Sequence, residues 1–137
     1  MRSLSGASSV GQIRPIFTVV EETPVLDAAH LDALRRLGTP PDGVLPELAG
    51  LFLRDAPIDL AGLAAAVAAD DRERAARLAH RLKGMGGHVG ATRFSLAARG
   101  LEQAAAAPGG SSLDGHLAAL RAAFDEVETA LGRVIQT

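Results

Sequence analysis

The residues best suited to chemistry form a small group around His80. On a helix of about 100° per residue, His80 lies roughly 140–180° away from the apolar residues that we expect to face the core, namely Leu78, Leu82, Met85 and Val89. Lys83 falls on the adjoining flank of this helix. Three small residues fall close to His80 on the exposed face, and they are Ala76, Gly84 and Gly87. The imidazole is therefore predicted to stand on an open patch with one cation beside it.

This pattern suits phosphoryl transfer. A neutral imidazole, whose unperturbed pKa is about 6.5, is nucleophilic near neutral pH without a general base. A neighbouring ammonium disfavours a protonated imidazole and can donate hydrogen bonds to phosphoryl oxygens. Attacking and leaving atoms must lie roughly in line, so a bulky side chain at Gly84 would hold a partner away. The group therefore favours a histidine that exchanges a phosphoryl group with another molecule.

The elements that must position this group are helices, separated by glycine and proline. We expect a first helix over 25–37 and a second that Asp42 caps and Pro57 kinks. The apolar stripe of this second helix is predicted to be Leu45, Leu48, Phe52, Leu60, Leu63 and Val67. A third helix should open at Asp70-Asp71 with Glu73 completing a capping box, and should loosen at Gly86, Gly87 and Gly90.

The fourth helix is expected over about 91–106, with Phe94, Ala97, Leu101 and Ala105 facing inward. The last helix has apolar residues that alternate by four and three, which favours near-antiparallel packing: Leu113, Leu117, Leu120, Phe124, Val127, Leu131 and Val134. We therefore predict an all-α fold, an antiparallel (up-down) four-helix bundle with a short additional N-terminal helix.

The domain organisation is predicted to be a flexible tail, residues 1–23, followed by one bundle domain, residues 24–137. The tail is rich in Ser and Gly and has no hydrophobic period. Its apolar run Ile16-Phe17-Thr18-Val19-Val20 is interpreted either as an extended lid docked on the bundle or as a remnant of a longer chain.

Composition excludes several classes of function. Hydrophobic residues make up 47% of the 137 residues and aromatic residues only 3%, which favours a core of aliphatic helix stripes. A formal net charge of −2 provides no electrostatic basis for binding nucleic acid. Without cysteine or a membrane-length apolar segment, we expect a cytoplasmic domain that has no disulfides and does not bind membranes. There is no Glu-x-x-His metal motif and no glycine-rich nucleotide loop, so we expect no metal site, no cofactor and no kinase activity.

The order and spacing of these residues resemble the histidine-containing phosphotransfer (HPt) domain family of two-component phosphorelays. The resemblance covers about residues 42–106, and its most specific segments are Ala79-His80-Arg81-Leu82-Lys83-Gly84, Val89-Gly90-Ala91 and Leu101-Glu102. Upstream, the segment from Leu51 to Pro57 resembles the preceding helix of the family. Four positions depart from the pattern: Met85, Gly86 and Gly87 stand where small Ser or Ala is commoner, and Phe94 replaces a usual Leu.

The resemblance implies that His80 is the phosphoacceptor, through Nε2, and that Lys83 assists the phosphoryl group. It implies that Gly84 permits the approach of a response-regulator receiver domain, whose own site would hold the divalent cation. We predict that Ala76, Arg77, Arg81 and Gly87 complete the docking surface, and that the partners are receiver domains and a hybrid sensor histidine kinase.

A monomer is expected, and the alternative function is a non-transferring adaptor that binds receivers. No chemistry is assigned to His30, His88 or His116, and Glu102 is expected at most to pair with a nearby cation.

Overall fold

The computed structural model describes residues 23–136, so the predicted tail lies outside the described residues except for Thr23. The described part of the chain folds into helices and contains no strand, which confirms the predicted all-α class. The helices are α2 (Ala28–Arg36), α3 (Leu45–Ala68), α4 (Arg72–His88), α5 (Thr92–Ala106) and α6 (Asp114–Gln136). Each of them begins and ends within about one turn of its predicted position.

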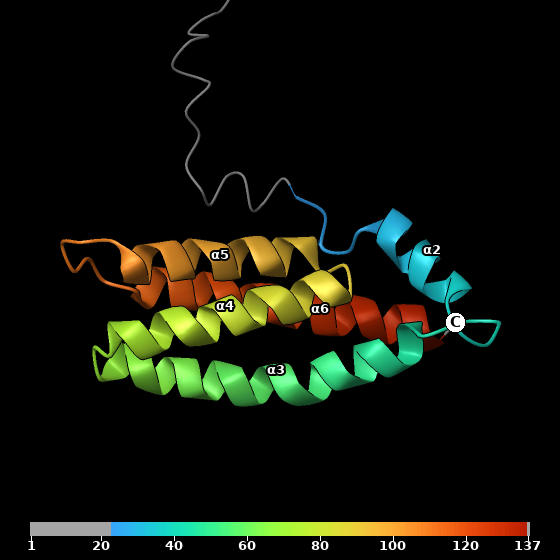
Figure 1. The fold of residues 1–137 in the computed structure, drawn as a ribbon, viewed down its shortest axis with the longest axis horizontal. Coiled ribbons are helices and arrows are strands. Elements are labelled where there is room, and N and C mark those ends of the chain that lie inside the picture. Colours follow the sequence, from blue (N-terminus) through green and yellow to red (C-terminus); the bar gives the residue numbers. More distant parts are fainter. Residues whose placement is uncertain (1–22, 137) are drawn as a thin grey trace, which may run out of the picture.

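Four long helices form the body of the molecule. Figure 1 shows α3, α4, α5 and α6 lying side by side along the long axis, with the shorter α2 at one end. Contacts join α3 to α4, α4 to α5, α5 to α6 and α6 back to α3, so the apolar stripes of these helices enclose a shared core. The helix α4, which carries His80, therefore has α3 on one side and α5 on the other.

The cores of α5 and α6 follow the predicted stripes. Phe94, Ala97, Leu101 and Ala105 of α5 are buried. In α6 and just before it, Leu113, Leu117, Leu120, Phe124, Val127 and Leu131 are buried, while Val134 is only partly covered. Phe52, Phe94 and Phe124 meet in the interior with ring centroids 5.2–6.2 Å apart. Aromatic contact thus joins α3, α5 and α6 beneath the helix that bears the histidine.

The buried face of α4 differs from the predicted one. Ala75, Ala79, Leu82 and Gly86 are its buried residues, and Val89 is buried just beyond its end. Leu78 and Met85 pack against the core as predicted, but they are only half-buried. The stripe of small residues lets neighbouring helices approach closely, and the larger side chains at 78 and 85 are displaced to the flank that faces α3.

Two of the predicted helix starts need correction. Asp71 caps α4 by accepting a hydrogen bond from the Arg74 backbone N–H at 3.2 Å. Glu73 does not complete a capping box, because it stands one residue too early and pairs with Arg77 instead. Asp42 does not cap α3 with its side chain. Pro46 lies in the first turn of α3, where its missing N–H has no helical partner to lose.

In the second helix, Leu45, Phe52, Leu60 and Leu63 are buried as predicted. Leu48 and Val67 are half-buried, and the remaining core positions of α3 are Ala49, Ala56, Asp59 and Ala66.

The helix α2 and the residue before it are hydrogen-bonded to the turn between α4 and α5. The Asp27 backbone N–H donates to the Gly90 carbonyl at 2.8 Å, and His30 Nε2–H donates to the His88 carbonyl at 2.9 Å. Gly90 has a φ of +74°, and a Cβ there would lie 3.0 Å from the His30 ring. Glycine therefore allows both the turn and the close approach of α2 to the end of α4.

Candidate functional site

His80 projects from the middle of α4 with its side chain 65% exposed. Its Nδ1 lies 2.8 Å from the Oε2 atom of Glu102 on α5. An ionised carboxylate can only accept hydrogen bonds, so the Nδ1 atom must carry a proton in this contact. In the neutral ring this leaves the lone pair on Nε2, the nitrogen on the other side of the imidazole. The pairing therefore leaves Nε2 as the ring nitrogen that can act as a nucleophile.

The same carboxylate also holds Lys83. The Lys83 Nζ atom donates to Glu102 Oε1 at 3.1 Å, so one carboxylate joins the imidazole and the ammonium. Partial burial raises the pKa of Glu102, but the hydrogen bonds from Lys83 and His80 and the positive charge of Lys83 outweigh it, and the pKa lies below its ordinary value. Glu102 is therefore held in the ionised form that this arrangement requires.

Glu102 is the residue of the site that the sequence analysis undervalued. It lies 22 residues from His80, on a different helix. Its expected pairing with a cation is confirmed by the contact with Lys83, but its contact with the imidazole was missed. Leu101-Glu102 is part of the family pattern, and this was the one feature of the sequence that indicated a role for Glu102 in the site. Whether its side chain reaches His80 depends on the rotation of α5 against α4, which periodicity alone does not define.

Gly86 determines how closely α5 approaches α4. A Cβ at this position would lie 2.6 Å from Ser95 Oγ and 2.8 Å from Phe94 Cδ2. Ser95 also donates a hydrogen bond to the Lys83 carbonyl at 2.8 Å, next to the site. Gly86 and Phe94, which both depart from the family pattern, thus lie against each other. The small residue at 86 leaves the space that the large ring at 94 fills. The helix α4 continues through Gly86 and Gly87 and ends at His88. The carbonyls of both glycines accept hydrogen bonds from the turn that follows, so the predicted weakening falls in the last turn of the helix.

The residues predicted to dock a partner surround His80. Ala76, Arg77 and Arg81 line a shallow depression together with His80 and Glu102. Cβ atoms built at Gly84 and Gly87 would have no heavy atom within 4 Å. Packing within the described structure therefore gives no reason for glycine at these two positions, and the surface beside the imidazole is open.

Both arginines of this depression have carboxylate partners. Arg77 pairs with Glu73 at 3.0 Å on the surface of α4. Arg81 pairs with Asp59 of α3 at 3.3 Å, and the side chain of Asp59 is only 9% exposed. The second oxygen of Asp59 has no hydrogen-bond partner in the described structure. Arg81 is thus bound to a buried charge, whereas Arg77 is bound to an exposed one.

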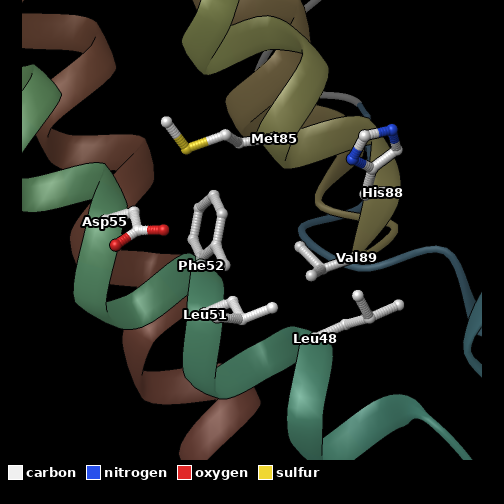
Figure 2. Close-up of a pocket in the computed structure, with 7 residues that line it drawn as sticks. All are labelled: Leu48, Leu51, Phe52, Asp55, Met85, His88 and Val89. Atoms are coloured by element: carbon white, nitrogen blue, oxygen red, sulfur yellow. The ribbon is translucent and has the colours of Figure 1, made fainter.

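A second depression lies on the other side of α4. Figure 2 shows it between α3 and α4, where Phe52 and Leu51 face Met85 and Val89, and His88 stands at the rim. It contains none of the residues that contact the His80 imidazole. Within the described residues, no group of three or more His, Asp or Glu side chains is placed to hold a metal ion. Over the same range, none of the helices has the length and apolar character needed to cross a membrane.

Comparison with known proteins gives one result. The family model of the Hpt domain matches residues 47–136, a span that contains His80, Lys83, Gly84 and Glu102. No curated protein and no solved structure gives a significant match. The match covers most of the chain, and the chain therefore belongs to the Hpt domain family. This confirms the resemblance found in the sequence and defines a phosphotransfer role in two-component signalling.

Proposed function

We propose that the protein is a phosphorelay intermediate that carries a phosphoryl group on His80 Nε2. It takes this group from a receiver-domain aspartate, including that of a hybrid kinase, and passes it to the aspartate of a response regulator. The observation that carries the proposal is the hydrogen bond from His80 Nδ1 to Glu102, which leaves Nε2 as the nucleophile of an exposed imidazole. Membership of the Hpt family supports the reaction class.

The transfer step needs no proton acceptor on this chain. The Nε2 lone pair forms a bond to phosphorus while the bond from phosphorus to the aspartyl oxygen breaks, and its electron pair returns to the carboxylate. The imidazole becomes positively charged because Nδ1 keeps its proton. Glu102 Oε2, 2.8 Å from Nδ1, stabilises this charge. Forward transfer to the next aspartate reverses these changes.

Lys83 and the open surface serve the phosphoryl group and the partner. An ammonium has three N–H donors, and those not used on Glu102 can bind phosphoryl oxygens as the group arrives or leaves. Ala76, Arg77, Arg81, Gly84 and Gly87 form the proposed docking surface for the receiver. The divalent cation of the reaction belongs to the receiver, and this chain acts as a phosphocarrier without binding ATP.

The proposal includes the organisation of the chain. Residues 24–137 form one HPt domain, an antiparallel up-down four-helix bundle with α2 as the additional helix, and residues 1–23 form a tail. The cyclic contacts among α3, α4, α5 and α6 support the bundle. We propose a cytoplasmic monomer that makes a small, transient contact with each receiver.

Transfer of label from phosphorylated receivers tests this function. The purified chain is incubated with a panel of labelled receiver domains, beside His80→Gln and the matched variant His88→Gln, which removes another exposed histidine of α4. We expect acid-labile, base-stable label on the wild type and on His88→Gln, and none on His80→Gln. If receivers bind but transfer no label to any variant, the chain is a non-transferring adaptor and the proposal is wrong.

A further inference from the structure

Three cations lie around His80, and they differ in how firmly their carboxylates hold them. Lys83 is bound by Glu102, which also binds the imidazole. Arg81 is bound by Asp59, whose side chain is 9% exposed. Arg77 is bound by Glu73, and the side chains of this pair are 64% and 88% exposed, respectively. Because exposed pairs are screened by water while buried charges are not, Arg77 is the cation that can leave its partner most easily.

Arg81 is not free to change partners in the same way. Its departure would leave the buried carboxylate of Asp59 without its cation, and one oxygen of that carboxylate already has no hydrogen-bond partner. An unpaired buried charge is strongly unfavourable. Lys83, in turn, remains beside the carboxylate that fixes the imidazole, so much of its charge is already neutralised.

From these differences we infer that Arg77 moves from Glu73 to the phosphoryl group once His80 is phosphorylated, and that it prolongs the lifetime of the phosphohistidine. This inference rests on the proposed function. Arg77 precedes His80 by three residues, a spacing that places two side chains on neighbouring parts of one helix surface. Both side chains line the same depression. A guanidinium can bind two phosphate oxygens at once. A phosphoryl group on His80 can therefore compete with the exposed carboxylate of Glu73 for Arg77.

The effect on lifetime follows from the loose transition state of phosphoryl transfer. As the bond between Nε2 and phosphorus breaks, its electron pair returns to the imidazole, and the metaphosphate-like group keeps about one negative charge on its oxygens in place of about two. A cation on those oxygens therefore stabilises the phosphohistidine more than the transition state for its loss to water. Arg77 would thus slow hydrolysis between one partner and the next, in addition to contacting the receiver.

Two substitutions that break the same ion pair separate this role from a structural one. Arg77→Gln removes the cation, and we expect the phosphohistidine to decay about threefold to fivefold faster, as for the loss of one exposed charge-assisted contact. Glu73→Gln removes the competing carboxylate and frees Arg77, so decay should be slower than in the wild type. If the pair only stabilised α4, both variants would shift in the same direction. Arg74→Gln, an equal change of charge on α4, is the matched control and should decay at the wild-type rate.

The experiment uses phosphoramidate as the donor, so that no receiver is present. His80 Nε2 forms the bond to phosphorus, and the donor nitrogen leaves as ammonia. After removal of the donor, the loss of label is followed at constant pH for the full chain and its variants. Faster decay in Arg77→Gln together with slower decay in Glu73→Gln supports the inference. Wild-type decay in Arg77→Gln, or equal shifts in both variants, overturns it while leaving the proposed function intact. If His80 of the wild type takes no label, the proposed function fails and the inference fails with it.

Discussion

Gly84 and Gly86 stand two residues apart on α4 and meet opposite surroundings. A Cβ at Gly86 would clash with Ser95 and Phe94 of α5, whereas a Cβ at Gly84 would meet nothing within 4 Å. The inward face of α4 is therefore constrained by packing inside the molecule. The outward face, with Gly84 and the exposed His80, has no such constraint. A residue type that weakens a helix needs a reason, and only on the inward face does the molecule itself supply one.

The largest effect is expected on the inward face. Leu82 is fully buried in the core, and Leu82→Ala should lower the free energy of unfolding by about 3 kcal/mol, because it removes apolar contacts and leaves a cavity. Urea denaturation measures the change. At temperatures where the variant stays folded, label transfer to His80 should remain near the wild-type rate. A variant of unchanged stability would contradict the packing described here.

Glu102 joins the two faces, since it extends from α5 to the exposed imidazole. Glu102→Gln retains an acceptor for the His80 Nδ1–H but loses the negative charge that stabilises the imidazole during attack. The rate of phosphoryl transfer should fall about tenfold, as expected for a hydrogen bond to a charged group. Single-turnover transfer from a phosphorylated receiver measures this rate. A wild-type rate in this variant would exclude the proposed role of the carboxylate.

Gly86→Ala tests whether packing requires glycine at that position. Phe94 is fully buried and contacts two other rings, so it cannot easily yield to a new methyl group. Overpacking costs about 1–3 kcal/mol, and replacing glycine in a helix returns about 1 kcal/mol. We expect a net loss of about 1 kcal/mol in the free energy of unfolding. Increased stability in thermal denaturation would show that α5 can adjust and that Gly86 is not required.

Gly84→Ala should act in the opposite direction on stability. The added methyl group meets open space, so the helix gains about 1 kcal/mol from the better helix former. Transfer from a receiver should nevertheless slow, because the methyl group lies on the surface that the partner is proposed to cover. Denaturation and transfer are measured on the same preparation. If transfer is unchanged, Gly84 lies outside the docking surface.

The smallest effect concerns pH. The pKa of Glu102 is lower in the folded protein than its ordinary value of 4.5. The stabilisation from its pairs is therefore fully present above the unfolded-state pKa, and it is lost as the pH falls through the folded-state pKa. The stability difference between the wild type and Glu102→Gln should shrink as the pH is lowered from 7 towards 3. Urea denaturation at several pH values measures this difference. If it stays constant from pH 7 to pH 3, the ionisation of Glu102 is not linked to the stability of the fold.

The helices and their approximate bounds could be predicted from the sequence, because the spacing of apolar residues and the positions of glycine and proline are read within each short segment of the chain. The burial of Leu101 and Phe94 and the exposure of His80 follow from the same period. The buried face of α4 could not be predicted as well, because Gly86 and Ala79 are buried through contacts with other helices. Hydrophobicity alone favours Leu78 and Met85 for the core, although both are only half-buried.

The sequence predicts the exposed position of the candidate acceptor His80, but it does not predict which carboxylates pair with the charged and titratable side chains around it. His80 and Lys83 lie on one helix, so their proximity follows from spacing. The contacts of Glu102 with His80 and of Asp59 with Arg81 join different helices. Such contacts depend on how two helices are rotated against each other, and one sequence does not define that rotation.

The central claim is that His80 accepts the phosphoryl group on Nε2 because Glu102 occupies Nδ1. The most direct test is NMR of the phosphorylated chain with ¹⁵N-labelled histidine, in which coupling to ³¹P identifies the bonded nitrogen. We predict a one-bond coupling to Nε2 of His80, absent from His80→Gln. A coupling to Nδ1 of His80, or to any nitrogen of His30, His88 or His116, would contradict the account.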